Sequence, residues 1–486
     1  MQNRKNSRLL KNWLSLDKRS LGFFRIALGC CLLIDLITRG LFFRAHYSSQ
    51  GLFPLRDYLV QPGVDLRRWS FLFMNDHPLF VGLFFIVSFF FVMALTLGYR
   101  VRLSGWVCWA IWVSLFRRNP LITNSGDIYL PLLLFWGNFL PWANRYSLEQ
   151  TSEDSPDYAK LPGFCYQIQV CILYWFSAVL RSGPEWQVDY SAIYFSLQAE
   201  RYNTLFSPWL LTLGTDVLQV VTFLTLALEF FGPFLLLLPW WRIRGLCVVV
   251  VVIFHLSIVL GLNIPIFALI GALGPLGILP GQFWKLKLLA PLDRKLTALF
   301  SRLANALKTS PPNDGKKPDY IVKVREIYPW LTLPAMALVI FGLHRGIYHP
   351  NRVSYLLGVT RVFSLDQRWG MFSPSPPLNS GWERVPASLK SGRTVNLLTL
   401  ETTDPAQPAG PHHAYPHQSR WFNLHAVLEA ERPGHTQLYL RYLVDRWNRA
   451  HPDDPVLAAR YEYHFRIHRP DYMLGDVGVR VYASYP

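Results

Sequence analysis

The sequence predicts an all-α polytopic membrane bundle of about nine transmembrane helices, followed by a small C-terminal α+β domain outside the membrane. Of the 486 residues, 51% are hydrophobic and only 16% are charged, whereas soluble proteins average about 25% charged residues. The apolar residues gather in long stretches, and the cationic residues flank those stretches, as they do in membrane proteins. These features exclude a disordered or coiled-coil chain and argue against a single soluble domain.

Nine apolar segments are candidates for membrane spans. They are residues 21–43, 79–98, 103–116, 127–142, 164–181, 216–239, 245–262, 264–280 and 328–345. A spanning helix needs roughly 20 residues and at least about 17, so the third and fourth segments are short. The stretch 245–280 would be about 54 Å long as one helix. It must therefore fold back, and Pro265 marks the break.

Most of the net charge of +17 lies beside apolar segments. Residues 1–20 carry six Lys/Arg and one acid, and residues 282–327 carry ten Lys/Arg and four acids. With nine crossings, these blocks and the cationic ends at 100–102 and 240–244 all face the cytoplasm. We therefore predict an inner-membrane protein with a cytoplasmic N-terminus and a periplasmic tail after residue 345. This distribution favours membrane topology over nucleic-acid binding.

The chain divides into five predicted parts. They are a basic cytoplasmic N-terminus (1–20), a transmembrane bundle (21–281), a cytoplasmic amphipathic helix and loop (282–327), a last transmembrane helix (328–345) and an extracytoplasmic α+β domain (346–486). Leucines spaced three and four apart over residues 285–308 predict an interfacial helix. The tail is predicted to hold a hairpin (383–389 and 393–399), a loop (401–419), a helix (436–450) and a strand (457–468).

Cysteine and histidine usage predicts neither a disulfide framework nor a metal site. All six cysteines lie in or beside apolar segments, and the last 140 residues contain none. The nearest candidate metal ligands are His412, His413 and His417, in a Pro-rich stretch without cysteine. We interpret that stretch as a solvated loop, and we expect no metal.

The first predicted span carries three charged residues, Arg25, Asp35 and Arg39. Charges inside a membrane are costly and are functional candidates by default. Asp35 and Arg39 are four residues apart and can pair on one helix face. The pair either fixes helix packing or takes part in function.

Glu229 and His255 lie in the middle of two consecutive antiparallel spans. A carboxylate and an imidazole so placed could handle protons as a pair. The alternative is that each side chain bonds a backbone carbonyl or a neighbouring polar group.

The loop over residues 117–127 is dense in polar groups between two short spans. Such a connection suggests a cavity that reaches into the membrane from outside. Arg117 or Arg118 could bind an anionic head group or a carboxylate there. The alternative is that both are ordinary interfacial arginines.

Several short motifs occur in fixed order between residues 15 and 280. They are Arg-Ile-Ala-Leu-Gly at 25–29 before Asp35, His46-Tyr47, Gly-Leu-Phe-Pro at 51–54, Asn119-Pro120 before Asp127, Pro141, Tyr-Ser-Leu at 146–148, Tyr-Trp-Phe-Ser-Ala-Val-Leu-Arg at 174–181, Trp186 and Ala192. Their order resembles the HTTM superfamily, whose best-known member is the vitamin K-dependent γ-glutamyl carboxylase. The stretch 367–374, followed by Gly381-Trp382, resembles the extracytoplasmic region of bacterial members. Its physical role would be a rigid aromatic–proline anchor that packs the tail onto the bundle.

The resemblance implies a bundle that holds a reduced quinone, such as menaquinone or a vitamin K-like compound, near its outer face. By position in the motifs, the family's catalytic lysine corresponds to Arg181 and the carboxylase's histidine to Asp127. Arginine keeps its proton in proteins and cannot be that base. We therefore do not expect classical glutamate carboxylation.

Two functional hypotheses remain. The first is a quinone- or lipid-binding enzyme with redox or carboxylase-like chemistry, and the second is a non-catalytic scaffold or assembly factor for a secreted partner. The candidate catalytic residues are Asp127, Arg181, Glu229 and His255, and the candidate cofactor contacts are Arg117, Arg118 and Trp186. Arg181 ends the fifth span and Asp127 begins the fourth, so both reach one membrane level. We expect them to face one cavity and to form an ion pair.

Overall fold

The computed structural model describes most of the chain. The described residues are 16–59, 69–149, 160–199, 202–307, 327–348, 355–400, 419–429, 433–469, 473 and 475–486. The predicted loop at 401–419, with His412, His413 and His417, lies outside these residues except for Ser419.

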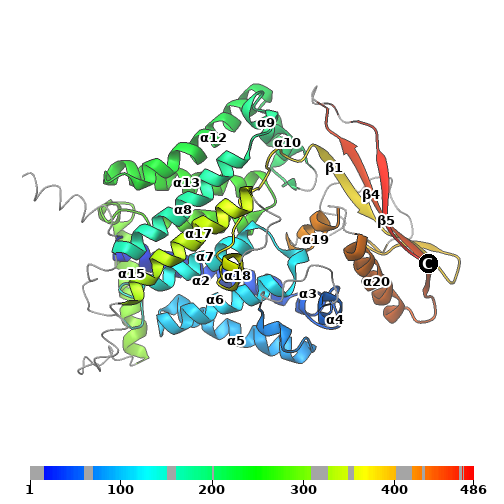
Figure 1. Ribbon diagram of the computed structural model, residues 1–486, viewed down its shortest axis with the longest axis horizontal. Coiled ribbons are helices and arrows are strands. Elements are labelled where there is room, and N and C mark those ends of the chain that lie inside the picture. Colours follow the sequence, from blue (N-terminus) through cyan, green and yellow to red (C-terminus); the bar gives the residue numbers. More distant parts are fainter. Residues whose placement is uncertain are drawn as a thin grey trace, which may run out of the picture.

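A helical bundle forms the larger part of the molecule (Figure 1). Its main helices are α2 (Lys18–Gly40), α5 (Pro78–Leu97), α6 (Val101–Arg118), α7 (Ser125–Phe139), α8 (Lys160–Leu180), α12 (Thr215–Leu237), α13 (Trp241–Gly261), α14 (Pro265–Leu276) and α17 (Thr332–Tyr348). Each of the nine predicted apolar segments overlaps one of them. The chain folds back between α13 and α14, and Pro265 begins the second helix as predicted.

Within the described residues, five helices are long and apolar enough to cross a membrane: α2, α5, α8, α12 and α13. The count of nine spans is therefore not confirmed. Length is the main physical reason. Helix α7 has 15 residues and α14 has 12, so they reach only about 23 Å and 18 Å at 1.5 Å per residue. The hydrocarbon core is about 30 Å thick.

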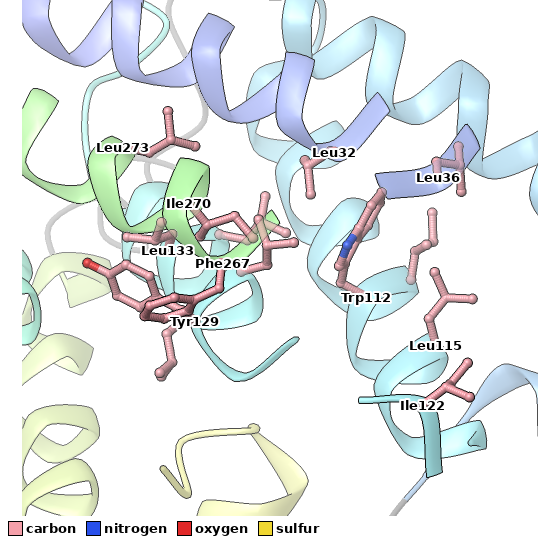
Figure 2. Close-up of a cluster of buried hydrophobic side chains, with 14 of the residues drawn as sticks. Leu32, Leu36, Trp112, Leu115, Ile122, Tyr129, Leu133, Phe267, Ile270 and Leu273 are labelled. Carbon is pink, nitrogen blue, oxygen red and sulfur yellow. The ribbon is translucent and has the colours of Figure 1, made fainter. Parts of the chain in front are cut away.

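Helix α7 lies at the centre of the bundle, and nearly all of its side chains are buried. A helix that is apolar on every side is expected in such a position. Figure 2 shows part of this core, where side chains of α2, α6, α7 and α14 meet. Among those labelled are Leu32, Trp112, Leu133, Phe267 and Ile270. In contrast, α5, α12 and α13 expose rows of apolar side chains, as surfaces that contact lipid do.

Helix α15 (Ala290–Ala306) confirms the helix predicted over residues 285–308. Asp293 in its first turn attaches it to the bundle. The carboxylate accepts a hydrogen bond from Tyr146 Oη at 2.7 Å and lies 3.5 Å from Arg145 and 3.7 Å from Arg19. Leu299 and Leu307 remain exposed, which suits a helix at a membrane interface.

The C-terminal part forms a small antiparallel sheet with two helices. Its elements are α18 (Tyr355–Val362), β1 (Asn379–Arg384), β2 (Pro386–Leu389), β3 (Thr394–Asn396), α19 (Ser419–Glu429), α20 (Pro433–Ala450), β4 (Val456–Ile467) and β5 (Gly478–Tyr485). The strand order is β1-β4-β2-β3, and β5 pairs with β4. The long strand β4 therefore organises the sheet, with β1, β2 and β5 all antiparallel to it. We call residues 379–486 the sheet domain.

The predicted hairpin, helix and strand of the tail are confirmed as β2–β3, α20 and β4. The sequence did not predict β1, β5 or α19. Strand β1 reads Asn-Ser-Gly-Trp-Glu-Arg, which has no apolar alternation. Its pairing with β4 runs from Asn379 opposite Ile467 to Arg384 opposite Glu462. This pairing, and not an apolar pattern of its own, holds β1 as a strand.

The sheet domain lies against one end of the bundle (Figure 1). There α19 packs on the short helix η2 (Pro120–Ile122), which precedes α7, and α3 (Phe43–Tyr47) follows α2 at the same end. We call this the sheet-domain end of the bundle. Both sites described below are built near it.

Candidate functional site

Four charged side chains form a closed ring at the sheet-domain end of the bundle. Asp35 and Arg39 come from α2, Asp127 from α7 and Arg420 from α19. Each arginine bonds both carboxylates: Arg39 Nε donates to Asp35 at 2.8 Å and Arg39 Nη2 to Asp127, while Arg420 donates to Asp35 and to Asp127. None of the four is more than 2% exposed. We call Asp35, Arg39, Asp127 and Arg420 the charge ring.

Local structure fixes the members of the charge ring that belong to the bundle. Asp35 and Arg39 stand one helical turn apart on α2, and their predicted pairing is confirmed. Asp127 belongs to a capping box, in which its carboxylate accepts the Asn124 amide at 2.7 Å and Asn124 caps the start of α7. Since two guanidinium groups also bond the Asp127 carboxylate, it is poorly placed to act as a base.

Neutral groups complete the hydrogen bonding around the charge ring. Trp112 Nε1 donates to Asp35 at 2.9 Å, and Tyr47 bonds Arg39. The Ile122 carbonyl accepts from Arg420 at 3.2 Å. Arg420 could not be predicted from the sequence, because it follows a Pro- and His-rich stretch and lies 293 residues from Asp127. No local pattern marks such a contact.

His46 of α3 lies beside the charge ring and is 1% exposed. Its ring packs on Trp421, with 4.7 Å between centroids. Neither ring nitrogen has a hydrogen-bond partner among the described residues. Burial, with the nearby cations Arg420 and Arg39, lowers the pKa of His46 to about 3. The imidazole is therefore neutral at physiological pH.

Acidification is expected to destabilise the protein through His46. In the unfolded chain the imidazole binds a proton below about pH 6.5, whereas in the folded protein it becomes protonated only near pH 3. Stability is therefore full above pH 6.5 and falls as the pH drops, by about 2 kcal/mol at pH 5. Thermal unfolding of purified protein at pH 7 and pH 5 measures this loss.

His46→Gln is expected to remove the part of the stability loss between pH 7 and pH 5 that comes from protonation of His46. Part of the pH dependence will remain, because burial also lowers the pKa of His468, to about 4. His451→Gln, at an exposed position directly after α20, is the matched control. An unchanged pH dependence in His46→Gln would contradict the assignment.

A second buried pair lies at the C-terminal end of α8. Arg181 pairs with Glu229 of α12, and the two side chains are 7% and 6% exposed. The Arg181 guanidinium stacks on the Trp186 ring at 4.3 Å, and its Nε donates to the Met371 carbonyl at 3.4 Å. The predicted pair of Arg181 with Asp127 is therefore wrong. Helix α12 packs directly on α8 and supplies the Glu229 carboxylate. Asp127 is already paired with the two arginines of the charge ring.

Tyr174 lies two turns before Arg181 on α8 and binds His255 of α13. Tyr174 Oη is 3.0 Å from His255 Nε2 and donates to the Gly271 carbonyl at 3.2 Å. When the hydroxyl donates its one proton to Gly271, the matching tautomer of His255 carries its proton on Nε2 and leaves Nδ1 as an acceptor. The predicted direct pairing of Glu229 with His255 does not occur among the described contacts. Each of the two bonds a residue of α8 instead.

Tyr129 of α7 adds a fifth polar group. Its hydroxyl is completely buried and has no partner among the described residues, and neither has His255 Nδ1. Tyr174 is close enough to interact electrostatically with both Tyr129 and Glu229. Figure 2 shows the Tyr129 hydroxyl beside α14. We call Tyr129, Tyr174, Arg181, Glu229 and His255 the α8 site.

Residues 367–374, which we call the strap, cover the α8 site. Trp369 packs edge-on against Tyr129, with 5.6 Å between ring centroids. Trp186 Nε1 donates to the Phe372 carbonyl at 2.8 Å, and the Gly183 amide donates to Pro374 at 2.9 Å. The strap is thus the aromatic–proline anchor that its sequence predicts.

The other predicted charges bond to protein groups. Arg117 Nη2 donates to the Arg361 carbonyl and to Asp366, both at 2.9 Å, and Arg118 Nη1 donates to the Phe53 carbonyl at 2.9 Å. These contacts hold the loop at the sheet-domain end together. Arg25 donates to the Trp142 carbonyl at 2.8 Å. In the part of the chain that the structure describes, no group of three His, Cys, Asp or Glu residues is placed to hold a metal.

Comparison with known families agrees with the resemblance. The model of the HTTM domain matches residues 13–274, more than half of the chain. The chain belongs to the HTTM family. No curated protein and no solved structure matches it.

The limits of the HTTM domain divide the charge ring and separate the α8 site from the strap. The matched residues contain Asp35, Arg39 and Asp127 of the charge ring and the whole α8 site. Arg420 and the strap lie beyond residue 274. The C-terminal part of this HTTM protein therefore completes one site and covers the other.

Proposed function

We propose that this HTTM protein is an integral membrane protein that binds a quinone or a lipid at the α8 site and carries out redox or carboxylase-like chemistry there. The observation that carries the proposal is the α8 site itself: five polar or ionisable groups buried inside an apolar bundle. Such groups are costly in a membrane and are retained where they act. Classical glutamate carboxylation is not proposed, because Arg181 occupies the place of the family's lysine.

The residues present fit a quinone. Tyr129 Oη can donate to a quinone carbonyl, and His255 Nδ1 can accept from the hydroxyl of a reduced quinone. Both atoms are buried without a partner among the described residues, and a buried polar group without a partner costs about 1–3 kcal/mol. A bound quinone would supply the electron transfer.

The chain's own residues would bind and move a proton. Neutral His255 can accept one at Nδ1, and Tyr174 connects its Nε2 to the neighbourhood of Glu229. Arg181 pairs with Glu229 and orients it, but cannot itself be the base. Asp127 is engaged in the charge ring and takes no part in this path.

The test is the small-molecule content of the purified protein. A quinone or a lipid should co-purify in mild detergent and be detected by mass spectrometry of the organic extract. Tyr129→Phe should lower its retention about tenfold, since losing one hydrogen bond to a buried group is worth about 1–1.5 kcal/mol. Tyr328→Phe, whose hydroxyl bonds the Asn138 carbonyl near the other end of α7, is the matched control. Equal retention in both variants, or no bound molecule, would exclude the proposal.

A scaffold for a secreted partner is the second candidate. Two attachments favour it, because Arg420 and the strap fix the sheet domain to the bundle, while Val479 and Val481 of β5 remain exposed on the sheet. A stoichiometric secreted protein bound to the purified sample, with no small molecule, would support this alternative over the enzyme.

We propose nine spans, with the N-terminus in the cytoplasm and the sheet domain in the periplasm of a bacterial cell. The placement of the Lys/Arg blocks supports this topology. A phosphatase reporter fused after Pro486, which acts only outside the cytoplasm, should be active. A fluorescent or β-galactosidase reporter at the same position works only in the cytoplasm. Its activity there would contradict this topology.

A further inference from the structure

The HTTM domain lacks one positive charge at its sheet-domain end. Its contribution to the charge ring is two carboxylates, Asp35 and Asp127, and one guanidinium, Arg39. All three side chains are at most 1% exposed. An uncompensated buried charge costs several kcal/mol. The domain therefore requires one more cation at this place, and Arg420 supplies it from outside the domain.

The arrangement of acceptors around the missing charge suits a guanidinium group. Two carboxylates on different helices present one oxygen each, and the Ile122 carbonyl presents a third acceptor. Arg420 reaches Asp35 with Nη2 and reaches Asp127 and Ile122 with Nη1. A planar fork with fixed donor directions can bridge two carboxylates in this way. An ammonium group is a compact, more strongly hydrated charge. It lacks the planar set of N–H donors that bridges the two carboxylates.

The two carboxylates are held by groups of the HTTM domain as well as by Arg420. Asp35 is held by Arg39 and by Trp112. Asp127 is held by the capping box of α7, and Ile122 lies in η2 just before it. The HTTM domain thus fixes both carboxylates by contacts of its own.

We infer that Asp35, Asp127 and the Ile122 carbonyl form a guanidinium-binding socket of the HTTM domain. Arg420 fills it as a ligand tethered to the sheet domain. The ligand class is a guanidinium on an alkyl stem, and a free alkylguanidinium binds the socket when the Arg420 side chain is absent. Occupancy of the socket is what attaches α19 to the bundle, independently of any ligand at the α8 site.

Chemical rescue tests this inference. Arg420→Ala leaves a cavity in the shape of the lost side chain and two carboxylates with one partner. Its melting temperature in detergent should fall by about 3–5 °C. Ethylguanidinium at millimolar concentration should restore at least half of the loss in a saturable manner. Wild type and Arg441→Ala, which removes an exposed arginine of α20, should show no such response.

Two results would overturn the socket. One is an Arg420→Ala protein that melts like wild type. The other is equal recovery with ethylammonium or with sodium chloride at the same ionic strength, which would show that any positive charge suffices.

A second variant keeps the test valid if Arg420→Ala does not fold. Asp127→Asn combined with Arg420→Ala leaves Asp35 and Arg39 as a neutral pair. This double variant should fold. It should bind ethylguanidinium at least tenfold more weakly than Arg420→Ala does. If Arg420→Ala cannot be purified, Arg420→Gly serves as the reference for this comparison. A double variant that fails to fold, or one that still responds to ethylguanidinium at the same concentration, would contradict the inference.

Discussion

Arg39→Met is expected to be the most destabilising single substitution in the bundle, at about 3–5 kcal/mol. Methionine matches the length of the aliphatic stem but leaves Asp35 and Asp127 with only Arg420 between them. Thermal or denaturant unfolding of the purified protein in detergent measures the loss. Arg44→Met, at an exposed arginine one helix later, should change stability by less than about 0.5 kcal/mol.

Removing one carboxylate together with Arg39 should restore much of that stability. Arg39→Met with Asp35→Leu leaves Asp127 and Arg420 as a neutral pair in apolar surroundings. Replacing a buried ion pair by apolar residues of similar volume is often neutral or stabilising. A double variant less stable than Arg39→Met alone would mean that Asp35 contributes mainly through Trp112 and not through charge.

Arg181→Met is expected to cost a similar amount, about 3–5 kcal/mol, because it leaves the Glu229 carboxylate buried without a cation. The structure identifies the substitution that compensates for it. Glu229→Leu in the same molecule should restore most of the stability, whereas Asp127→Leu should add a further loss. Unfolding of the three variants side by side distinguishes the two partners.

The reverse pattern would support the pairing that the sequence predicted. If Asp127→Leu compensated for Arg181→Met and Glu229→Leu did not, the Arg181–Glu229 contact would be incorrect. Additive losses in both double variants would mean that Arg181 acts through Trp186 and the strap alone.

Local signals predicted the helices and one pair of the charge ring. Apolar runs located all nine main helices, because burial in a bundle or in lipid requires such runs whatever the final packing. The spacing of four residues predicted the contact between Asp35 and Arg39. The motif at 367–374 predicted an anchor, since adjacent aromatic and proline residues restrict the chain and pack well.

Long-range partners could not be predicted in the same way. The choice of Asp127 for Arg181 rested on membrane level alone, which places many residues at one height without giving their positions around the bundle. Glu229 is recognisable in the sequence as a charged residue inside an apolar segment. Its partner, however, depends on the packing of α12 on α8. Arg420 carried no local signal, and its role arises only when the sheet domain folds back onto α2 and α7.

The central claim is that the sheet domain is attached to the HTTM domain by charge pairing through Arg420. A double-mutant cycle between Arg420→Met and Asp127→Leu, read as free energies of unfolding, tests it most directly. We predict a coupling energy of at least about 1.5 kcal/mol between the two sites, and less than about 0.5 kcal/mol in a control cycle between Arg420→Met and Asp366→Leu, since Asp366 bonds Arg117 instead. Additive losses from Arg420→Met and Asp127→Leu would contradict the account.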